Sequence, residues 1–314
     1  MSTYYGRPIL KQPVWKPEVA LYFFTGGLAG ASGLLAFIAG LLGNRRLHRA
    51  ALLSATGGAL ISPVLLTVDL GRPERFHHML RVFKPTSPMS VGSWILAAFS
   101  SSSAAATGSE LLGILRPAGL AAETAAAVLG PALATYTGAL VADTAIPAWH
   151  EARDELPFVF AGGAAASAGA MAALLTPARD AGPARRLAVF GALLEAAAST
   201  VMKRRLEQLA EVYEEGEVRQ LDRAAQILGL GGAAGLALSG RRRLTASLFA
   251  ACLLAGALCQ RFAIFRAGFS SARRTTGEGA VGPAPRREAS PGLVAGDRAP
   301  GMSLRQPVRT APSS

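Results

Sequence analysis

The stretch Val68–Trp94, VDLGRPERFHHMLRVFKPTSPMSVGSW, joins two apolar segments and is dense in charged and helix-breaking residues. Gly71 and Pro73 interrupt the preceding helix, because glycine is flexible and proline lacks a backbone donor. The apolar residues that follow recur at roughly helical spacing as far as Pro85 and Pro88, which predicts a short helix lying flat on a membrane surface. A link that only turns the chain is the alternative, since every pair of membrane helices needs a polar connection.

The composition predicts a helical protein that crosses a membrane several times. The 314 residues are 51% hydrophobic and 17% charged, and the mean hydropathy is +0.32. The charges gather in short blocks between apolar runs of about 20 residues, the length that a bilayer core requires. The net charge is +12, but the basic residues lie in short links and the C-terminal tail. They therefore indicate anionic lipid as a partner rather than nucleic acid.

The apolar runs predict an all-α fold, with eight transmembrane helices in two four-helix bundles. The expected spans are residues 19–42, 51–70, 89–107, 125–147, 156–175, 187–202, 224–239 and 244–265. The expected domains are an interfacial segment 1–17, a first bundle 18–147 that holds the candidate site, a second bundle 148–267 and a basic tail 268–314. We expect the tail to be disordered because Gly, Pro, Arg and Ser dominate it, and residues 203–223 to form a long soluble helix.

Arginine clusters predict how the chain lies across the cytoplasmic membrane. Three clusters follow odd-numbered segments: Arg45, Arg46 and Arg49; Arg179, Arg185 and Arg186; and Arg241–Arg243. The positive-inside rule puts these links in the cytoplasm and both termini on the outer face. Residues 22–33 also align with residues 158–169, which suggests two parallel repeats.

Ionisable and phenolic side chains in or near the spans are the candidate site residues, because charge is costly inside a bilayer. They are Asp143, Glu195 and Arg261 within spans, Glu18, Asp69 and Glu123 near span ends, and the phenols Tyr22 and Tyr136. Oxidation of a quinol needs an apolar slot, donors for two oxygens and a group that accepts protons. Glu18, Tyr22, Asp69 and Tyr136 together have these properties, if they converge on one slot. Anchoring in the headgroup belt is the alternative for the two tyrosines.

The sequence shows no pattern for a metal site. All four histidines lie in links, whereas a membrane b-type haem needs histidines inside spans. Cys252 and Cys259 lie two helical turns apart, and their spacing fits neither zinc nor an iron–sulfur cluster. We therefore expect a chain without haem, iron–sulfur cluster or other metal.

Several motifs resemble one membrane-protein family. Asp69–Phe76 (DLGRPERF), Ser87–Trp94 (SPMSVGSW), Leu21–Gly30, Tyr136-Thr-Gly, Pro147, Trp149, Arg261 and Gly268 are similar to the pattern of the NrfD family, also called the polysulfide reductase membrane-subunit family. The resemblance covers about residues 15–270. It implies a haem-free, eight-helix anchor that exchanges electrons between a membrane quinone such as menaquinone and a four-cluster iron–sulfur subunit. That subunit serves a molybdopterin oxidoreductase, usually on the outer face.

The resemblance also implies roles for individual residues. Tyr136 stands where the family has a quinone-binding tyrosine, and Tyr22 stands near the position of a histidine. Glu18 or Val19 stands near the family's asparagine. We therefore assign Tyr22 and Tyr136 to the quinone oxygens and Glu18 or Asp69 to proton exchange.

The remaining assignments concern charged residues. Arg72 and Asp143 are further candidates for cofactor binding. Arg72 and Arg75 can also pair with Asp69. The candidates for docking the partner are Arg75, His77 and Arg81. Arg261 is expected to pair with a buried acid, Asp143 or Glu195. Any enzymatic activity on a terminal substrate belongs to the complex rather than to this chain. A secondary transporter and a passive anchor without quinone turnover are the alternative functions.

Overall fold

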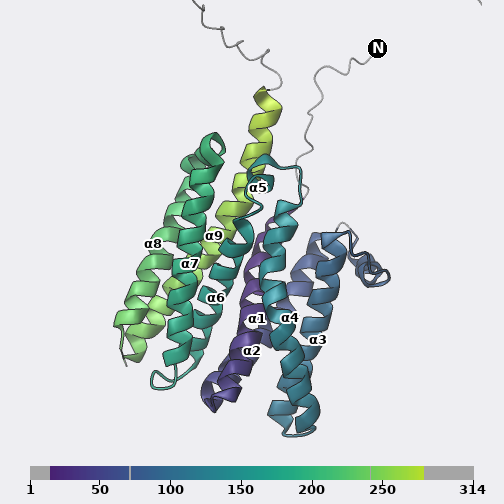
Figure 1. Ribbon diagram of the computed structural model, residues 1–314, viewed down its shortest axis with the longest axis vertical. Coiled ribbons are helices and arrows are strands. Elements are labelled where there is room, and N and C mark those ends of the chain that lie inside the picture. Colours follow the sequence, from purple (N-terminus) through teal and green to yellow (C-terminus); the bar gives the residue numbers. More distant parts are fainter. Residues whose placement is uncertain (1–14, 71, 241, 279–314) are drawn as a thin grey trace, which may run out of the picture. The chain divides into compact units, whose positions relative to one another are not determined.

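The computed structural model describes residues 15–70, 72–240 and 242–278, and in this part of the chain all regular structure is helical (Figure 1). The long helices are α1 (Pro17–Leu41), α2 (Arg45–Asp69), α3 (Pro88–Leu112), α4 (Arg116–Ala142), α6 (Leu156–Leu175), α7 (Gly182–Leu206), α8 (Gly216–Leu238) and α9 (Arg243–Glu278). The short elements are α5 (Pro147–His150) and the 3₁₀ helices η1 (Pro73–Leu80) and η2 (Glu207–Glu214). The predicted all-α class is confirmed.

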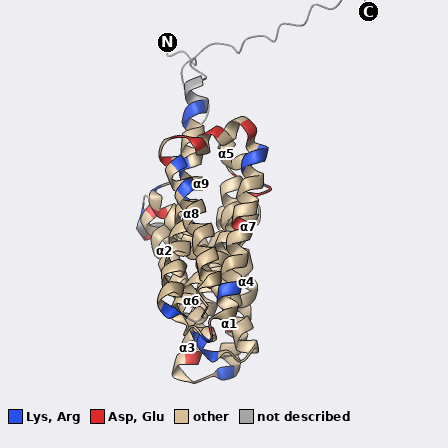
Figure 2. Cartoon of the chain, turned by 90° about the vertical axis from the view of Figure 1, so that its left-hand side faces the viewer, with Lys and Arg blue, Asp and Glu red and all other residues tan. Residues whose placement is uncertain are grey.

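The helices have the properties of a multi-pass membrane protein. Five of them, α1, α2, α4, α6 and α9, contain stretches long and apolar enough to cross a bilayer. Figure 2 shows that charged residues gather toward the two ends of the helices, while the central part is mostly uncharged. The prediction that all eight long helices cross the membrane remains a prediction, because α3, α7 and α8 are not among those five.

Residues at the helix ends explain where several helices begin. Proline occupies the first turn of α1, α3 and α4, where its missing N–H leaves no hydrogen bond unmade. The side chain of Asn44 caps α2 by accepting a hydrogen bond of 3.2 Å from the Leu47 backbone. Gly113 ends α3 with a φ of 68°, a left-handed conformation that glycine adopts without strain.

The long helices pack in two groups of four with a shared core. In the first group α1 packs on α2 and α4, and α3 packs on α2 and α4; in the second, α6 and α8 each pack on α7 and α9. Gly30 and Gly130 let α1 and α4 touch, because an added Cβ at Gly30 would lie 2.4 Å from the Gly130 oxygen. Helix α6 also packs along α1, α2 and α4. The division into two separate bundles therefore stays a prediction.

The structure corrects two predictions about the C-terminal half. Helix α9 does not end near residue 267 but continues to Glu278, because Ala267 and Ala272 are buried in the core. Residues 203–223 do not form one soluble helix: α7 ends at Leu206, η2 follows, and α8 begins at Gly216. Positive φ values of 45° at Glu207 and 50° at Gly216 break the helical path. Most of the predicted N-terminal segment and of the tail, residues 1–14 and 279–314, lies outside the described residues.

Candidate functional site

Asp69 ties the end of α2 to the start of α1. Its Oδ1 atom accepts a hydrogen bond of 2.9 Å from the backbone N–H of Lys16. The ammonium of Lys16 donates in turn to the Val68 carbonyl at 3.5 Å. The Asp69 carboxylate thus holds the end of α2 against the start of α1.

The link between α2 and α3, residues 72–87, is mostly exposed and packs on α3; it is called the flap below. The short helix predicted here is present as the 3₁₀ helix η1, which ends at Leu80, before Pro85. The side chains of Arg72, His77 and Arg81 are exposed. Ser90 at the start of α3 holds the flap, since its Oγ accepts from the Lys84 N–H at 3.1 Å and donates to the Val82 carbonyl at 3.2 Å. The side chain of Arg75 lies outside the described part of the structure. The flap therefore presents basic groups to solvent.

Tyr22 and Tyr136 come together in the core of the first helix group. Tyr22 on α1 is 1% exposed and Tyr136 on α4 is half-buried. Their helices, α1 and α4, pack directly on each other. Gly92 on α3 makes room for the Tyr136 ring, because an added Cβ would lie 1.8 Å from its Cζ atom. Gly92 belongs to the motif Ser87–Trp94, and the motif by itself gives this glycine no role. Its lack of a side chain beside a tyrosine on another helix could be found only from the fold.

Polar groups on α1 and α2 lie near Tyr22. Thr25 and Ser62 share a hydrogen bond of 2.9 Å between their hydroxyls, and Ser62 is fully buried. Glu18 lies one turn before Tyr22, so both side chains are on one face of α1. The Oε2 atom of Glu18 is buried and has no hydrogen-bond partner within the described residues. A buried carboxylate oxygen without a partner is a group that can accept a proton or a ligand hydroxyl.

Asp143 is not inside a span, which corrects its prediction as a buried acid. It follows the last residue of α4 and its side chain is exposed. The reason is that α4 ends at Ala142, where the chain turns toward α5. Asp143 is therefore at the surface, apart from the buried Tyr22.

Arg261 pairs with Glu195, which decides between its two predicted partners. The Nη1 atom of Arg261 on α9 lies 3.4 Å from Oε1 of Glu195 on α7, and both residues are buried. The guanidinium also lies 4.3 Å from the centre of the Phe160 ring and donates to the Phe160 carbonyl at 3.1 Å. Gly163 on α6 leaves space for both charged groups. This ion pair links three helices of the second group.

Trp149 packs against Gly268 in the hydrophobic core. The Trp149 indole donates to the Ile264 carbonyl at 2.8 Å and stacks on Trp15 with ring centres 5.4 Å apart. Gly268 gives room to the indole, because an added Cβ would lie 2.0 Å from it. These contacts join α5 to α9 and to the residues just before α1.

No cluster of three or more His, Cys, Asp or Glu side chains suited to a metal ion occurs within residues 15–70, 72–240 and 242–278. In the same part of the chain both cysteines are free thiols. The side chains near the two tyrosines supply phenols, hydroxyls and one carboxylate.

The helices, their apolar centres and the buried polar groups define a multi-pass helical membrane protein. The sequence profile of the polysulfide reductase family, of the NrfD type, matches residues 1–274. The chain belongs to this family, which confirms the resemblance seen in its motifs. No curated protein matches the chain. Family membership indicates a membrane anchor of an oxidoreductase, with oxidoreductase subunits as partners.

Proposed function

We propose that the chain is the membrane anchor and quinone-binding subunit of a multi-subunit oxidoreductase. It passes electrons between menaquinone and an iron–sulfur subunit, which is coupled to a molybdopterin catalytic subunit. The observation that carries this proposal is that buried Tyr22 on α1 and Tyr136 on the adjoining α4, whose ring fits against Gly92, lie in the core of a chain of this family. The family supplies the electron-transfer partners, and the tyrosine pair supplies the binding chemistry.

The residues around the tyrosine pair suit a quinone head group. A quinone has two oxygens that accept hydrogen bonds and, once reduced, two hydroxyls that release protons when electrons leave. Each phenol can donate to one oxygen or accept from one hydroxyl. The unpartnered Oε2 of Glu18 can accept a released proton. Tyr136 is only half-buried, whereas Tyr22 is buried. A quinone in the bilayer would therefore enter the site past Tyr136 to reach Tyr22.

The exposed flap is the surface we assign to the iron–sulfur partner. Arg72, Arg75, His77 and Arg81 belong to the link between α2 and α3, and this link is joined to α1 through Asp69 and Lys16. Arginines can pair with an acidic partner surface and so set its orientation. In this arrangement electrons have a short path from the tyrosine pair to the partner, and the flap and both termini face the outside of the cell.

The test is quinol-dependent reduction of the iron–sulfur subunit in the complex purified from native membranes. We expect the partner to copurify and its cluster absorbance to bleach on addition of a menaquinol analogue. Tyr136→Phe and Tyr22→Phe remove one hydroxyl each and should slow this reduction about tenfold or more, since one lost hydrogen bond in the transition state has that order of effect. Tyr213→Phe is the matched control, because this phenol lies in η2, outside the tyrosine pair.

Different failures have different meanings. If the complex assembles but quinol does not reduce the clusters, the chain is a passive anchor. If the chain purifies alone and moves a solute into liposomes, it is a transporter. If Tyr136→Phe prevents assembly, the tyrosine has a structural role and its assignment to the quinone is wrong.

A further inference from the structure

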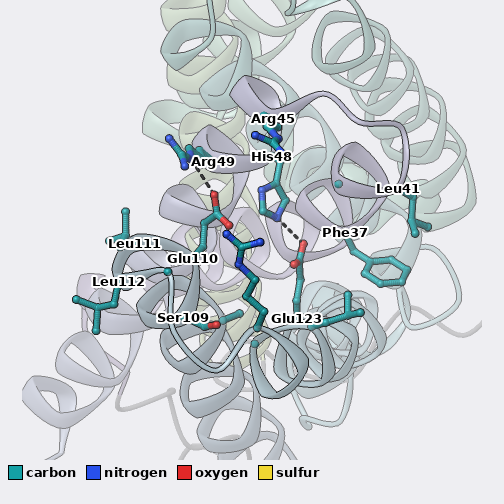
Figure 3. A pocket seen from close by; sticks show the side chains of 16 residues that line it. Phe37, Leu41, Arg45, His48, Arg49, Ser109, Glu110, Leu111, Leu112 and Glu123 are labelled. Atoms are coloured by element: carbon teal, nitrogen blue, oxygen red, sulfur yellow. Dashed lines mark hydrogen bonds and ion pairs between the residues drawn. The ribbon is translucent and has the colours of Figure 1, made fainter.

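A large open cavity lies at the end of the first helix group that is opposite the tyrosine pair. Its volume is about 670 Å³. It is lined by the ends of α1 and α3 and the beginnings of α2 and α4, including Phe37, Arg45 and Glu123 (Figure 3). Phe37 is four turns along α1 from Tyr22. The cavity is therefore separate from the proposed quinone site.

Both acidic side chains of this cavity are already paired. His48 Nε2 lies 2.9 Å from Glu123 Oε1, and Arg49 Nε lies 2.8 Å from Glu110 Oε1, as the dashed lines in Figure 3 show. The His48–Glu123 pair is mostly buried, with 12% and 13% of the side chains exposed. Each glutamate therefore has a close partner within the lining, and Glu110 is also near enough to Arg45 for their charges to attract.

Two arginines of the lining remain without an ion pair to any described residue. Arg45 at the start of α2 and Arg116 at the start of α4 are exposed, and both line the cavity. A guanidinium offers a planar fork of donors that matches a phosphate group. The lining contains three arginines and only two glutamates, so it carries a net positive charge that favours an anion.

The rim of the cavity is apolar. Its leucines are 58–71% exposed at the protein surface: Leu41, Leu111, Leu112 and Leu120. In a membrane protein such side chains contact acyl chains rather than water. The cavity thus has free arginines beside side chains suited to lipid tails, an arrangement that matches an amphiphile with an anionic head.

We propose that this cavity binds the phosphate head group of an anionic phospholipid, with Arg45 and Arg116 on the phosphate and the leucines against the acyl chains. Free phosphate shares the head-group chemistry, but it would leave the leucine rim unused. Binding here clamps the beginnings of α2 and α4 together. The proposal does not depend on quinone binding at Tyr22 and Tyr136.

The test is the phospholipid that copurifies with the full chain in mild detergent, measured by extraction and mass spectrometry. We expect anionic phospholipid to be retained, and the Arg45→Gln, Arg116→Gln double variant to lose it by about tenfold or more, given the contribution of each basic residue. Arg186→Gln is the control, an exposed arginine on α7 that does not line the cavity. Asn44 and Arg46, at the start of α2, bond to Asp180, just before α7, so the control lies at the same end of the helices.

A second arm distinguishes the source of the phosphate. Delipidated chain is titrated with phosphatidylglycerol or with inorganic phosphate, and thermal stability is measured. Stabilisation by the lipid alone, lost in the Arg45→Gln, Arg116→Gln variant, supports the proposal. Equal stabilisation by inorganic phosphate, equal lipid retention by the double variant, or a quinone recovered in place of the phospholipid would overturn it.

Discussion

Arg261 lies 3.4 Å from Glu195 across the interface of α9 and α7, and both residues are buried. The ion pair leaves part of its hydrogen-bonding capacity unused, because Arg261 Nη1 and Glu195 Oε1 have no hydrogen-bond partner within the described residues. A buried pair of this kind contributes little net stability, since removing both charges from water offsets their attraction. Each residue nevertheless depends on the other, because either charge alone would be uncompensated.

We predict that Glu195→Gln destabilises the chain by about 3–5 kcal/mol, the usual effect of leaving one buried charge without its partner. Unfolding in detergent, followed by circular dichroism, measures this change. The double variant Glu195→Leu, Arg261→Met removes both charges and should recover most of the loss. A single variant as stable as the original chain would show that Arg261 finds another acceptor or water.

We predict that Gly92→Ala displaces Tyr136, because the new Cβ would lie 1.8 Å from the tyrosine Cζ. The cost of overpacking is about 1–3 kcal/mol, and quinol-dependent reduction of the partner should fall with it. Gly108→Ala is the matched control on the same helix, since no heavy atom lies within 4 Å of its Cβ position. Full turnover by Gly92→Ala would separate Tyr136 from the quinone chemistry.

We predict an alkaline loss of stability that depends on Tyr213. Burial, and secondly the negative charge of Asp222, raise the pKa of the Tyr213 phenol above its ordinary value of 10.0. The folded state therefore holds the proton more tightly than the unfolded state, so this stability is present below pH 10 and is lost as the pH rises above it.

Tyr213→Phe tests this effect. Because the Tyr213 hydroxyl is buried without a hydrogen-bond partner in the described structure, the variant should be at least as stable at neutral pH. Its stability should also decline less between pH 10 and pH 11. Lys203, whose ammonium lies 5.5 Å from the ring centre in the original chain, is present in both chains. Identical alkaline profiles would refute the prediction.

Helical periodicity and helix-breaking residues made much of the fold predictable. Pro73 and Pro88 mark the first turns of η1 and α3, and the apolar runs correspond to the long helices. The predictions failed where sequence composition and packing disagree. Polar residues 203–223 were predicted as one helix, but positive φ values at Glu207 and Gly216 divide them. Burial of Ala267 and Ala272 extends α9 beyond its expected end.

The candidate site was predictable only residue by residue. The types of side chain and the family motif singled out Tyr22, Tyr136 and Glu18. Their neighbours did not follow from the sequence: Asp69 bonds to the backbone of Lys16, and Gly92 forms the notch beside Tyr136. Asp143 was misplaced because one residue more or less at a helix end moves a side chain from the core to the surface.

The sequence by itself determined that this is a helical membrane protein of the NrfD type, because hydropathy and turn residues act locally and need no knowledge of neighbouring helices. The tertiary structure alone decided which groups meet: Glu195 rather than Asp143 for Arg261, and a cavity at the far end of α1 with Arg45 and Arg116 in its lining. Such pairings depend on the rotation and relative height of helices far apart in the chain. Those are fixed by packing over the whole core, which no single segment encodes.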